Sequence, residues 1–227
     1  MAIRNHPSTF AGAIIAGVVV WSSALLGSQA SDEAAIAELK KAGAATKVEQ
    51  GFLTQVGFVK GSDPEPLLLL VQGLPRLSAV QLGGTQISDS GLAALAGMAQ
   101  LEYVGLRGTA IGDGGLIHLA GLKKLTKLIL ADTKVTDDGI AHLGAIAQLE
   151  ELNLTNDAIT DAGLAHLANL TRITGLNLTG TKVTDAGLVH LKKMRRLTKL
   201  TLTNTAVTDQ GVERAKSFMP FFSKVLR

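Results

Sequence analysis

The sequence contains no cysteine, and this absence excludes several kinds of chemistry. Without thiols we expect no disulfide, no thiolate-bound metal, no cysteine nucleophile and no lipid anchor on an N-terminal cysteine. Aromatic residues make up 4% of the 227 residues, so a core must be filled mainly by aliphatic side chains. The formal net charge is only +3, which gives no general electrostatic argument for binding nucleic acid, and we expect none.

Residues 1–30 have the composition of a secretory signal peptide. Arg4 supplies a positive charge, residues 11–27 are uncharged and mostly apolar, and Ser28-Gln29-Ala30 places small residues at the cleavage positions. We expect cleavage after Ala30. An uncleaved N-terminal anchor is the alternative, because the apolar stretch is near the lower limit for spanning a bilayer. The sequence therefore predicts an exported protein, periplasmic or extracellular, that meets the membrane only through an uncleaved N-terminal segment.

One pattern recurs every 24 residues from Leu77 to Pro220, in six units that begin at Leu77, Leu101, Leu125, Leu149, Ile173 and Leu197. Every unit has apolar residues at unit positions 1, 4, 6, 11, 16, 19 and 22. Positions 4 and 6 alternate as in a strand, whereas 16, 19 and 22 share one face of a helix. Each unit therefore reads as strand, loop, helix, loop. Neighbouring units must stack, because one unit cannot bury its apolar face alone.

The repeated pattern L-x-x-L-x-L-x-x-T-x-I/V-x-D-x-G-L-x-x-L resembles a leucine-rich repeat. The 24-residue length and residues 160–167, T-D-A-G-L-A-H-L, are similar to bacterial leucine-rich repeat proteins related to the GALA and F-box-associated kind. The resemblance implies an α/β fold: a right-handed solenoid shaped as a horseshoe arc, with a parallel concave sheet and convex helices. It implies little about function, since this scaffold serves many partners. We see no room before the repeats for an F-box and expect no ubiquitin-ligase function.

Outside the six units, at residues 77–220, the sequence predicts caps at both ends. Residues 31–52 read as an N-terminal cap with a short helix from Ser31 and a strand at residues 46–50, and a second strand follows Gly51 at residues 53–59. Residues 53–76 form a degenerate first repeat, because Leu53 lies one period before Leu77. Residues 221–227 are an apolar tail that we expect to fold against the last repeat as a C-terminal cap. Terminal repeats are commonly atypical because one side meets solvent.

Polar and small residues also recur with the same period. Threonine at unit position 9, replaced by Asp157 in the fourth unit, is expected to bond loop backbone groups. Glycines at position 15, such as Gly163 and Gly187, are expected to relieve crowding between the first helical turn and the adjacent loop. Aspartates at position 13 are interpreted as helix N-caps rather than calcium ligands: Asp89, Asp113, Asp137, Asp161, Asp185 and Asp209.

Histidines recur at unit position 18, at His118, His142, His166 and His190. A shared metal site is one interpretation of such a row. However, Ala94 and Arg214 occupy the same position in the first and sixth units, which favours a solvent-facing position without a metal. We also find no catalytic constellation that converges on the sheet. The sequence therefore predicts no enzyme activity, no metal and no cofactor.

Two surfaces are candidates for binding. On the concave sheet, outward-facing positions vary strongly between units. The candidate ligand-binding residues there are Tyr103, Arg107, Lys127, Glu151, Asn153 and Asn177. They predict a non-catalytic scaffold that recognises a protein or glycan. The alternative is an envelope-associated structural protein that binds anionic polymer or a membrane surface through a basic edge at Lys192, Lys193, Arg195 and Arg196.

Overall fold

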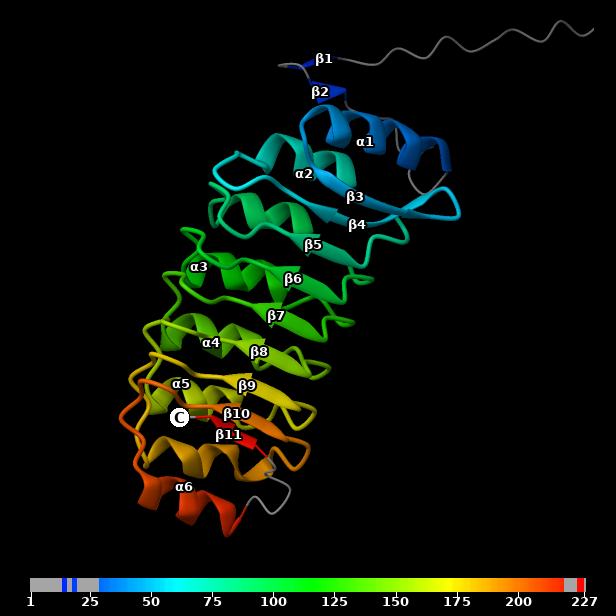
Figure 1. Ribbon diagram of the computed structural model, residues 1–227. Coiled ribbons are helices and arrows are strands. Elements are labelled where there is room, and N and C mark those ends of the chain that lie inside the picture. The colour runs from blue at the N-terminus through cyan, green and yellow to red at the C-terminus, as the bar shows by residue number, and fades with distance from the viewer. Residues whose placement is uncertain (1–13, 16–17, 20–28, 219–223, 227) are drawn as a thin grey trace, which may run out of the picture.

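The computed structural model describes residues 14–15, 18–19, 29–218 and 224–226, and it has strands along one face and helices along the other (Figure 1). Nine strands form one sheet in the order β11-β10-β9-β8-β7-β6-β5-β4-β3. Every neighbouring pair is parallel except β3 and β4, which are antiparallel. The strands are β3 (Ala45–Glu49), β4 (Phe52–Gly57), β5 (Ala79–Gln81), β6 (Tyr103–Gly105), β7 (Lys127–Ile129), β8 (Glu151–Asn153), β9 (Gly175–Asn177), β10 (Lys199–Thr201) and β11 (Lys224–Leu226). A separate antiparallel pair joins β1 (Ile14–Ile15) to β2 (Val18–Val19).

The strands of successive units pair without slip, because all units have the same length. Equal unit positions therefore lie opposite one another, as in the row Tyr103, Lys127 and Glu151. The side chains at the seven apolar positions are buried in all six units, except for the partly buried Phe218. Burying each such leucine, isoleucine or valine stabilises the fold by about 1.5–3 kcal/mol. The parallel sheet, the helical layer and one continuous core confirm the predicted solenoid.

The opposite layer contains α-helices and 3-10 helices. The α-helices are α1 (Gln29–Lys41), α2 (Glu65–Val71), α3 (Asp113–Leu116), α4 (Asp137–Leu143), α5 (Asp161–Leu167) and α6 (Asp209–Lys216). The 3-10 helices are η1 (Gly91–Leu95), η2 (Ile117–Leu119) and η3 (Gly187–Lys193). The predicted helical positions are right, but the apolar spacing did not reveal which segments are 3-10. Segments of one or two turns are short enough for the tighter 3-10 geometry to compete.

The residue after each strand turn has a left-handed backbone. At unit position 8, φ lies between 56° and 72° in all six units, at Gly84, Gly108, Asp132, Asn156, Gly180 and Asn204. Glycine, asparagine and aspartate are the residues that adopt this conformation with the least steric cost. The choice of residue at this position therefore follows from the turn that leads the chain away from the sheet.

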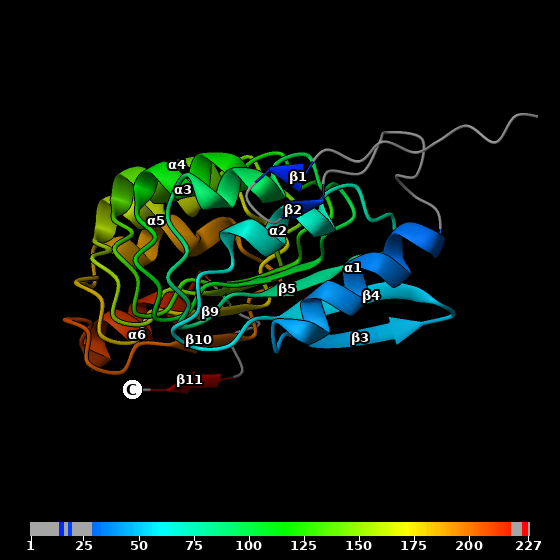
Figure 2. The same ribbon diagram turned by 90° about the horizontal axis from the view of Figure 1, so that it is seen from above.

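The N-terminal end of the described chain is closed by a hairpin and a helix, and Figure 2 shows α1 packed over β3 and β4. The hairpin turn at Gln50 and Gly51 has φ of 53° and 81°, as a tight two-residue turn between twisted strands requires. Asp32 in α1 is fully buried, and its Oδ2 accepts a hydrogen bond from the Leu53 amide at 2.7 Å. This bond ties α1 to β4.

The ends differ in part from the prediction or lie outside the described residues. α1 begins at Gln29, two residues before the predicted Ser31, so the predicted cleavage bond after Ala30 lies in its first turn. Most of the predicted signal peptide or anchor, residues 1–13, 16–17 and 20–28, lies outside the described residues. In the described ranges, no helix combines the length and apolar character that crossing a bilayer requires. At the other end β11 pairs with β10, whereas residues 219–223 and 227 are outside the described part.

Candidate functional site

The aspartates at unit position 13 join successive repeats. In the central example, Asp137 accepts two hydrogen bonds from Thr160 of the next unit: the amide reaches Oδ1 at 2.9 Å and the hydroxyl reaches Oδ2 at 2.5 Å. The same pair of bonds links Asp113 to Thr136, Asp161 to Thr184 and Asp185 to Thr208. In the degenerate repeat, one oxygen of Glu65 accepts both the amide and the hydroxyl of Ser88. In the first regular unit, Asp89 accepts the Gly112 amide.

The predicted helix-capping role of these aspartates is therefore wrong. The N-cap residues of α4, α5 and α6 are Thr136, Thr160 and Thr208. A carboxylate has two acceptor oxygens, and the amide and hydroxyl of one threonine match them. Each carboxylate thus fixes the first turn of the helix in the next unit relative to the helix of its own unit.

The glycines at position 15 make room for these carboxylates. A Cβ atom on Gly163 would collide with Oδ1 of Asp137, and one on Gly187 would collide with Oδ1 of Asp161. The predicted relief of crowding is right in kind, but the neighbour is a side chain of the preceding repeat rather than the adjacent loop.

Threonine at position 9 bonds its own turn, as predicted: Thr85, Thr109, Thr181 and Thr205 each donate a hydroxyl hydrogen bond of 2.7 Å to the carbonyl three residues earlier. Asp157 differs, because its Oδ1 accepts the amide and hydroxyl of Thr133 in the preceding unit. Its side chain is 2% exposed, and Oδ2 has no hydrogen-bond partner among the described residues. Burial raises the pKa of the Asp157 carboxyl to about 7.

The histidine row lies on the helical layer, away from the sheet. His166 is exposed, and His118, His142 and His190 are half-buried. Within the part of the chain that the structure describes, no three histidine, aspartate or glutamate side chains are grouped to hold a metal ion.

We use the term concave face for the solvent-facing side of the nine-stranded sheet. All six predicted binding residues lie on it or at its rim. Tyr103, Lys127 and Glu151 are neighbours on β6, β7 and β8, whereas Arg107 follows β6 at the rim. Two ion pairs involve these residues. Lys127 Nζ lies 2.6 Å from Glu151 Oε2, and Arg107 Nε lies 3.1 Å from Asp132 Oδ2.

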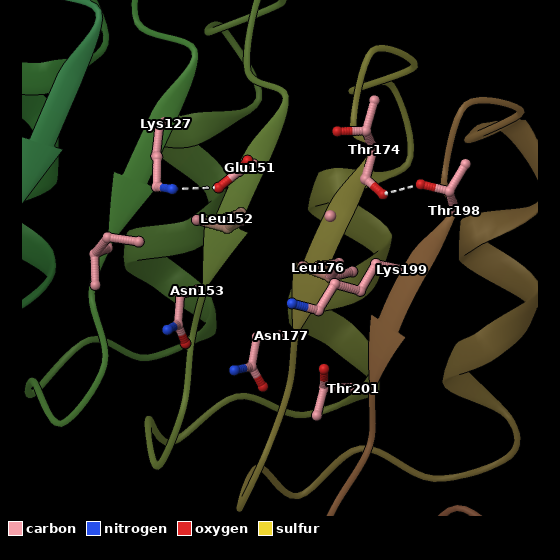
Figure 3. Close-up of a pocket in the computed structure, with 12 residues that line it drawn as sticks. Lys127, Glu151, Leu152, Asn153, Thr174, Leu176, Asn177, Thr198, Lys199 and Thr201 are labelled. Carbon is pink, nitrogen blue, oxygen red and sulfur yellow. Dashed lines mark hydrogen bonds and ion pairs between the residues drawn. The ribbon is translucent and has the colours of Figure 1, made fainter. Parts of the chain in front are cut away.

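The concave face has two hollows, and they divide the predicted patch. The N-terminal hollow, of about 590 Å³, is lined by Tyr103 together with Gln81, Ala79 and residues of β3 and β4. The central hollow, of about 370 Å³, lies over β7 to β10 (Figure 3). It is lined by Lys127, Ile129, Glu151, Leu152, Asn153, Thr174, Gly175, Leu176, Asn177, Thr198, Lys199 and Thr201. Tyr103 and the Lys127–Glu151 pair are therefore neighbours in register but line different hollows.

The central hollow results from one missing side chain. Gly175 lies between Glu151 on β8 and Lys199 on β10 in the same row of the sheet. A Cβ added there would lie 3.7 Å from Glu151 Cγ, which is ordinary van der Waals contact. The binding residues predicted from the sequence did not include Gly175 or Lys199. The signal for the hollow was a glycine at unit position 3, where the neighbouring units have long side chains.

Asn153 and Asn177 lie side by side in the hollow, on β8 and β9 (Figure 3). Each amide oxygen accepts a hydrogen bond from the backbone N–H of a threonine two residues later at 3.0 Å and from its hydroxyl at 2.7 Å. Because a backbone N–H only donates, the bonded atom must be the oxygen. Nδ2 of both residues therefore points away from the turn, and neither donates to a described protein group.

The residues of the basic edge lie at the end of η3 and in the connection to β10. Lys192, Lys193, Arg195 and Arg196 are all exposed. Lys193 Nζ donates to Asn169 Oδ1 at 3.3 Å. Among the described residues, none of the four cations forms an ion pair with a carboxylate.

Comparisons with known proteins agree with this architecture. The family described as Leucine Rich repeat matches residues 75–96 and 121–144. The crystal structure of an internalin C2 from Listeria monocytogenes superposes with a TM-score of 0.62 and 20% identity, over 84% of this chain and 90% of that one. An internalin, inlF, from the same organism gives a TM-score of 0.53 and 22% identity, over 75% of this chain and 52% of that one.

The present chain thus spans about half the length of inlF. No curated protein matches it. The finer resemblance to the GALA and F-box-associated kind stays a prediction. The matched family and the shared architecture lead to one conclusion: the chain contains leucine-rich repeats and has the leucine-rich repeat fold.

Proposed function

We propose that this chain is a non-catalytic binding scaffold, exported from the cytoplasm, that holds a protein or glycan partner on its concave face. The observation that carries the proposal is the contrast between the two sides of the sheet. The inward side chains are apolar in every repeat, whereas the outward ones line two hollows whose walls include polar and charged side chains. Polar groups held on a rigid sheet can be arranged for recognition before a partner arrives.

The rigidity of this face supports the proposal. The outward side chains stand on strands in continuous register, and the carboxylate–threonine bonds join each repeat to the next. Asn153 and Asn177 are each fixed by two hydrogen bonds. A surface already ordered loses less conformational entropy on binding, so more of the contact energy appears as affinity.

Photo-crosslinking tests where the partner binds. Benzoylphenylalanine in place of Tyr103 or Ile129 probes the two hollows, and the same group in place of the exposed Ala141 on α4 is the control. We expect one partner, identified by mass spectrometry, to be captured from both concave positions and not from Ala141. A further variant carries benzoylphenylalanine in place of Lys193 on the basic edge. If this variant captured a partner and neither concave variant did, the concave face would be rejected in favour of the basic edge.

The basic edge supports the second candidate function, association with an anionic polymer or membrane surface. Its four exposed cations lack carboxylate partners within the described ranges, so their charge is available to an anion. Replacing all four by glutamine would abolish that association. Binding through this edge should also weaken steeply with salt, because exposed charges are screened.

Export is proposed from the composition of residues 1–30. Mass spectrometry of the protein recovered outside the cytoplasm should show Ser31 as its first residue. Arg4 still attached in that protein would contradict cleavage and favour the N-terminal anchor.

A further inference from the structure

We propose that the central hollow binds a carboxylate side chain, presented by an extended acidic segment of a protein partner. This inference rests on the proposed scaffold function and adds the chemistry of what the hollow recognises. Three observations carry it: the charge balance of the hollow, the hydrogen-bond donors in its lining, and the space left by Gly175.

The charge balance favours an anion. Lys127 and Glu151 form an ion pair at 2.6 Å, so their charges offset each other. Lys199 forms no ion pair with a carboxylate of the described residues. Figure 3 shows its side chain reaching from β10 towards β9, where its neighbour in register is Gly175. The three charged side chains around the hollow therefore leave one positive charge beside an empty position.

Two amide donors also belong to the lining of the hollow. Nδ2 of Asn153 and Nδ2 of Asn177 lie on adjacent strands, which are about 4.8 Å apart in a sheet. Their oxygens are already occupied by threonines, so each amide offers only N–H groups to a ligand. One ammonium and two amide groups in the lining of one hollow supply donors that suit the two acceptor oxygens of a carboxylate.

Phosphate fits this site less well. Protein phosphate sites commonly use arginine forks, clustered backbone N–H groups or a helix N-terminus. The lining has no arginine, and its strands β8 and β9 engage their backbone in the ladder. The lining also has no aromatic ring on which a sugar could stack. A volume of about 370 Å³ is near the lower end for ligand pockets, which suits one side chain rather than a large ligand.

NMR titration of the full chain with a hexaglutamate peptide tests the proposal, with hexaglutamine as the matched neutral probe. We expect the side-chain NH₂ signals of Asn153 and Asn177 to shift with hexaglutamate only. Lys199→Gln should weaken binding about tenfold, because it removes a hydrogen bond from a charged group. Gly175→Leu should also weaken binding by filling the hollow, whereas Gly175→Ala should not. Lys193→Gln, on the basic edge, is the charge-matched control.

Several outcomes would overturn the proposal. One is that Lys199→Gln and the unchanged protein bind hexaglutamate with equal affinity. Another is that Lys193→Gln loses as much affinity as Lys199→Gln. A third is that trigalacturonate binds more tightly than hexaglutamate, which would identify an acidic glycan instead. Should Gly175→Leu fail to fold, Lys199→Gln still decides. The two proposals fail separately. If hexaglutamate does not bind but a partner still crosslinks at Ile129, only the carboxylate proposal is rejected. If no concave position crosslinks a partner, the scaffold proposal is rejected.

Discussion

Asp157 departs from the repeat pattern and lowers the free energy of unfolding when its carboxyl group is ionised. It replaces the threonine of unit position 9, lies almost fully buried, and leaves Oδ2 without a partner among the described residues. Burial raises the pKa of this carboxyl from 3.8 to about 7, because the charged form loses its hydration. The protonated form is therefore favoured on folding. The stabilisation is complete below pH 3.8 and is lost as the pH rises through about 7.

We predict that Asp157→Asn removes this pH dependence. The asparagine keeps an acceptor oxygen for Thr133 and carries no charge at any pH. At pH 8 the variant should exceed the unchanged protein in free energy of unfolding by up to about 4 kcal/mol, and the two should converge near pH 4. Urea denaturation at a series of pH values measures the difference. Asp138→Asn, at an exposed position on α4, should stay within about 0.5 kcal/mol throughout. A constant difference at all pH values for Asp157→Asn would contradict the assignment.

At the scale of the element, the start of each helix depends on the preceding one. We predict that Gly163→Ala destabilises the protein by about 1–3 kcal/mol, since its Cβ would collide with the Asp137 carboxylate behind α5. Gly121→Ala is the control, because a Cβ there meets nothing within 4 Å. The double variant Gly163→Ala with Asp137→Ser shortens the colliding side chain and should recover part of the loss. Additive costs in thermal or urea unfolding would mean that the two residues do not interlock.

The strands were predictable because a strict 24-residue period fixes both their position and their register. The role of the aspartates was not predictable from one unit, because Asp113, Asp137, Asp161 and Asp185 each bond a threonine 23 residues later. Within a unit the same aspartate simply looks like a helix cap. The joint recurrence of threonine at position 12, aspartate at 13 and glycine at 15 was the signal of contact between units. The left-handed turn at position 8 left a similar signal in its glycines, asparagines and aspartate.

The candidate site was predictable only as a list of outward-facing residues. Alternation along the strand places Tyr103, Lys127 and Glu151 on one face, and the structure has them there. The sequence did not reveal that a missing side chain at Gly175 opens a hollow, since a hollow depends on the neighbours' lengths and directions. Nor did it reveal that Thr155 and Thr179 orient two asparagines.

At the scale of the whole molecule, repeats of equal length and equal contacts should be exchangeable. We predict that deleting residues 125–148, one complete unit, leaves a folded protein. Asp113 would then meet Thr160 instead of Thr136, and Asp157 would meet Thr109 instead of Thr133. Stability should fall by one repeat's share, because a solenoid is approximately a sum of repeats and their interfaces. Urea unfolding followed by circular dichroism should show one transition with a smaller m-value.

Deleting residues 125–136 is the control, because it removes β7 and keeps α4. This half-unit deletion should abolish the cooperative transition. A cooperative transition in the half-unit variant, or its loss in the whole-unit variant, would contradict the exchange of equivalent contacts.

Synthesis on the ribosome begins at the end of the molecule that carries the β3–β4 hairpin. A hairpin forms in about 1–10 μs, far faster than the chain grows at about 5–20 residues per second. β4 is therefore paired before β5 emerges, and each later strand through β10 follows its neighbour by 24 residues. A nascent strand thus waits about 1–5 s for the next one. During that time the growing end of the sheet exposes the edge of one strand, which limits its opportunity to associate with other nascent chains.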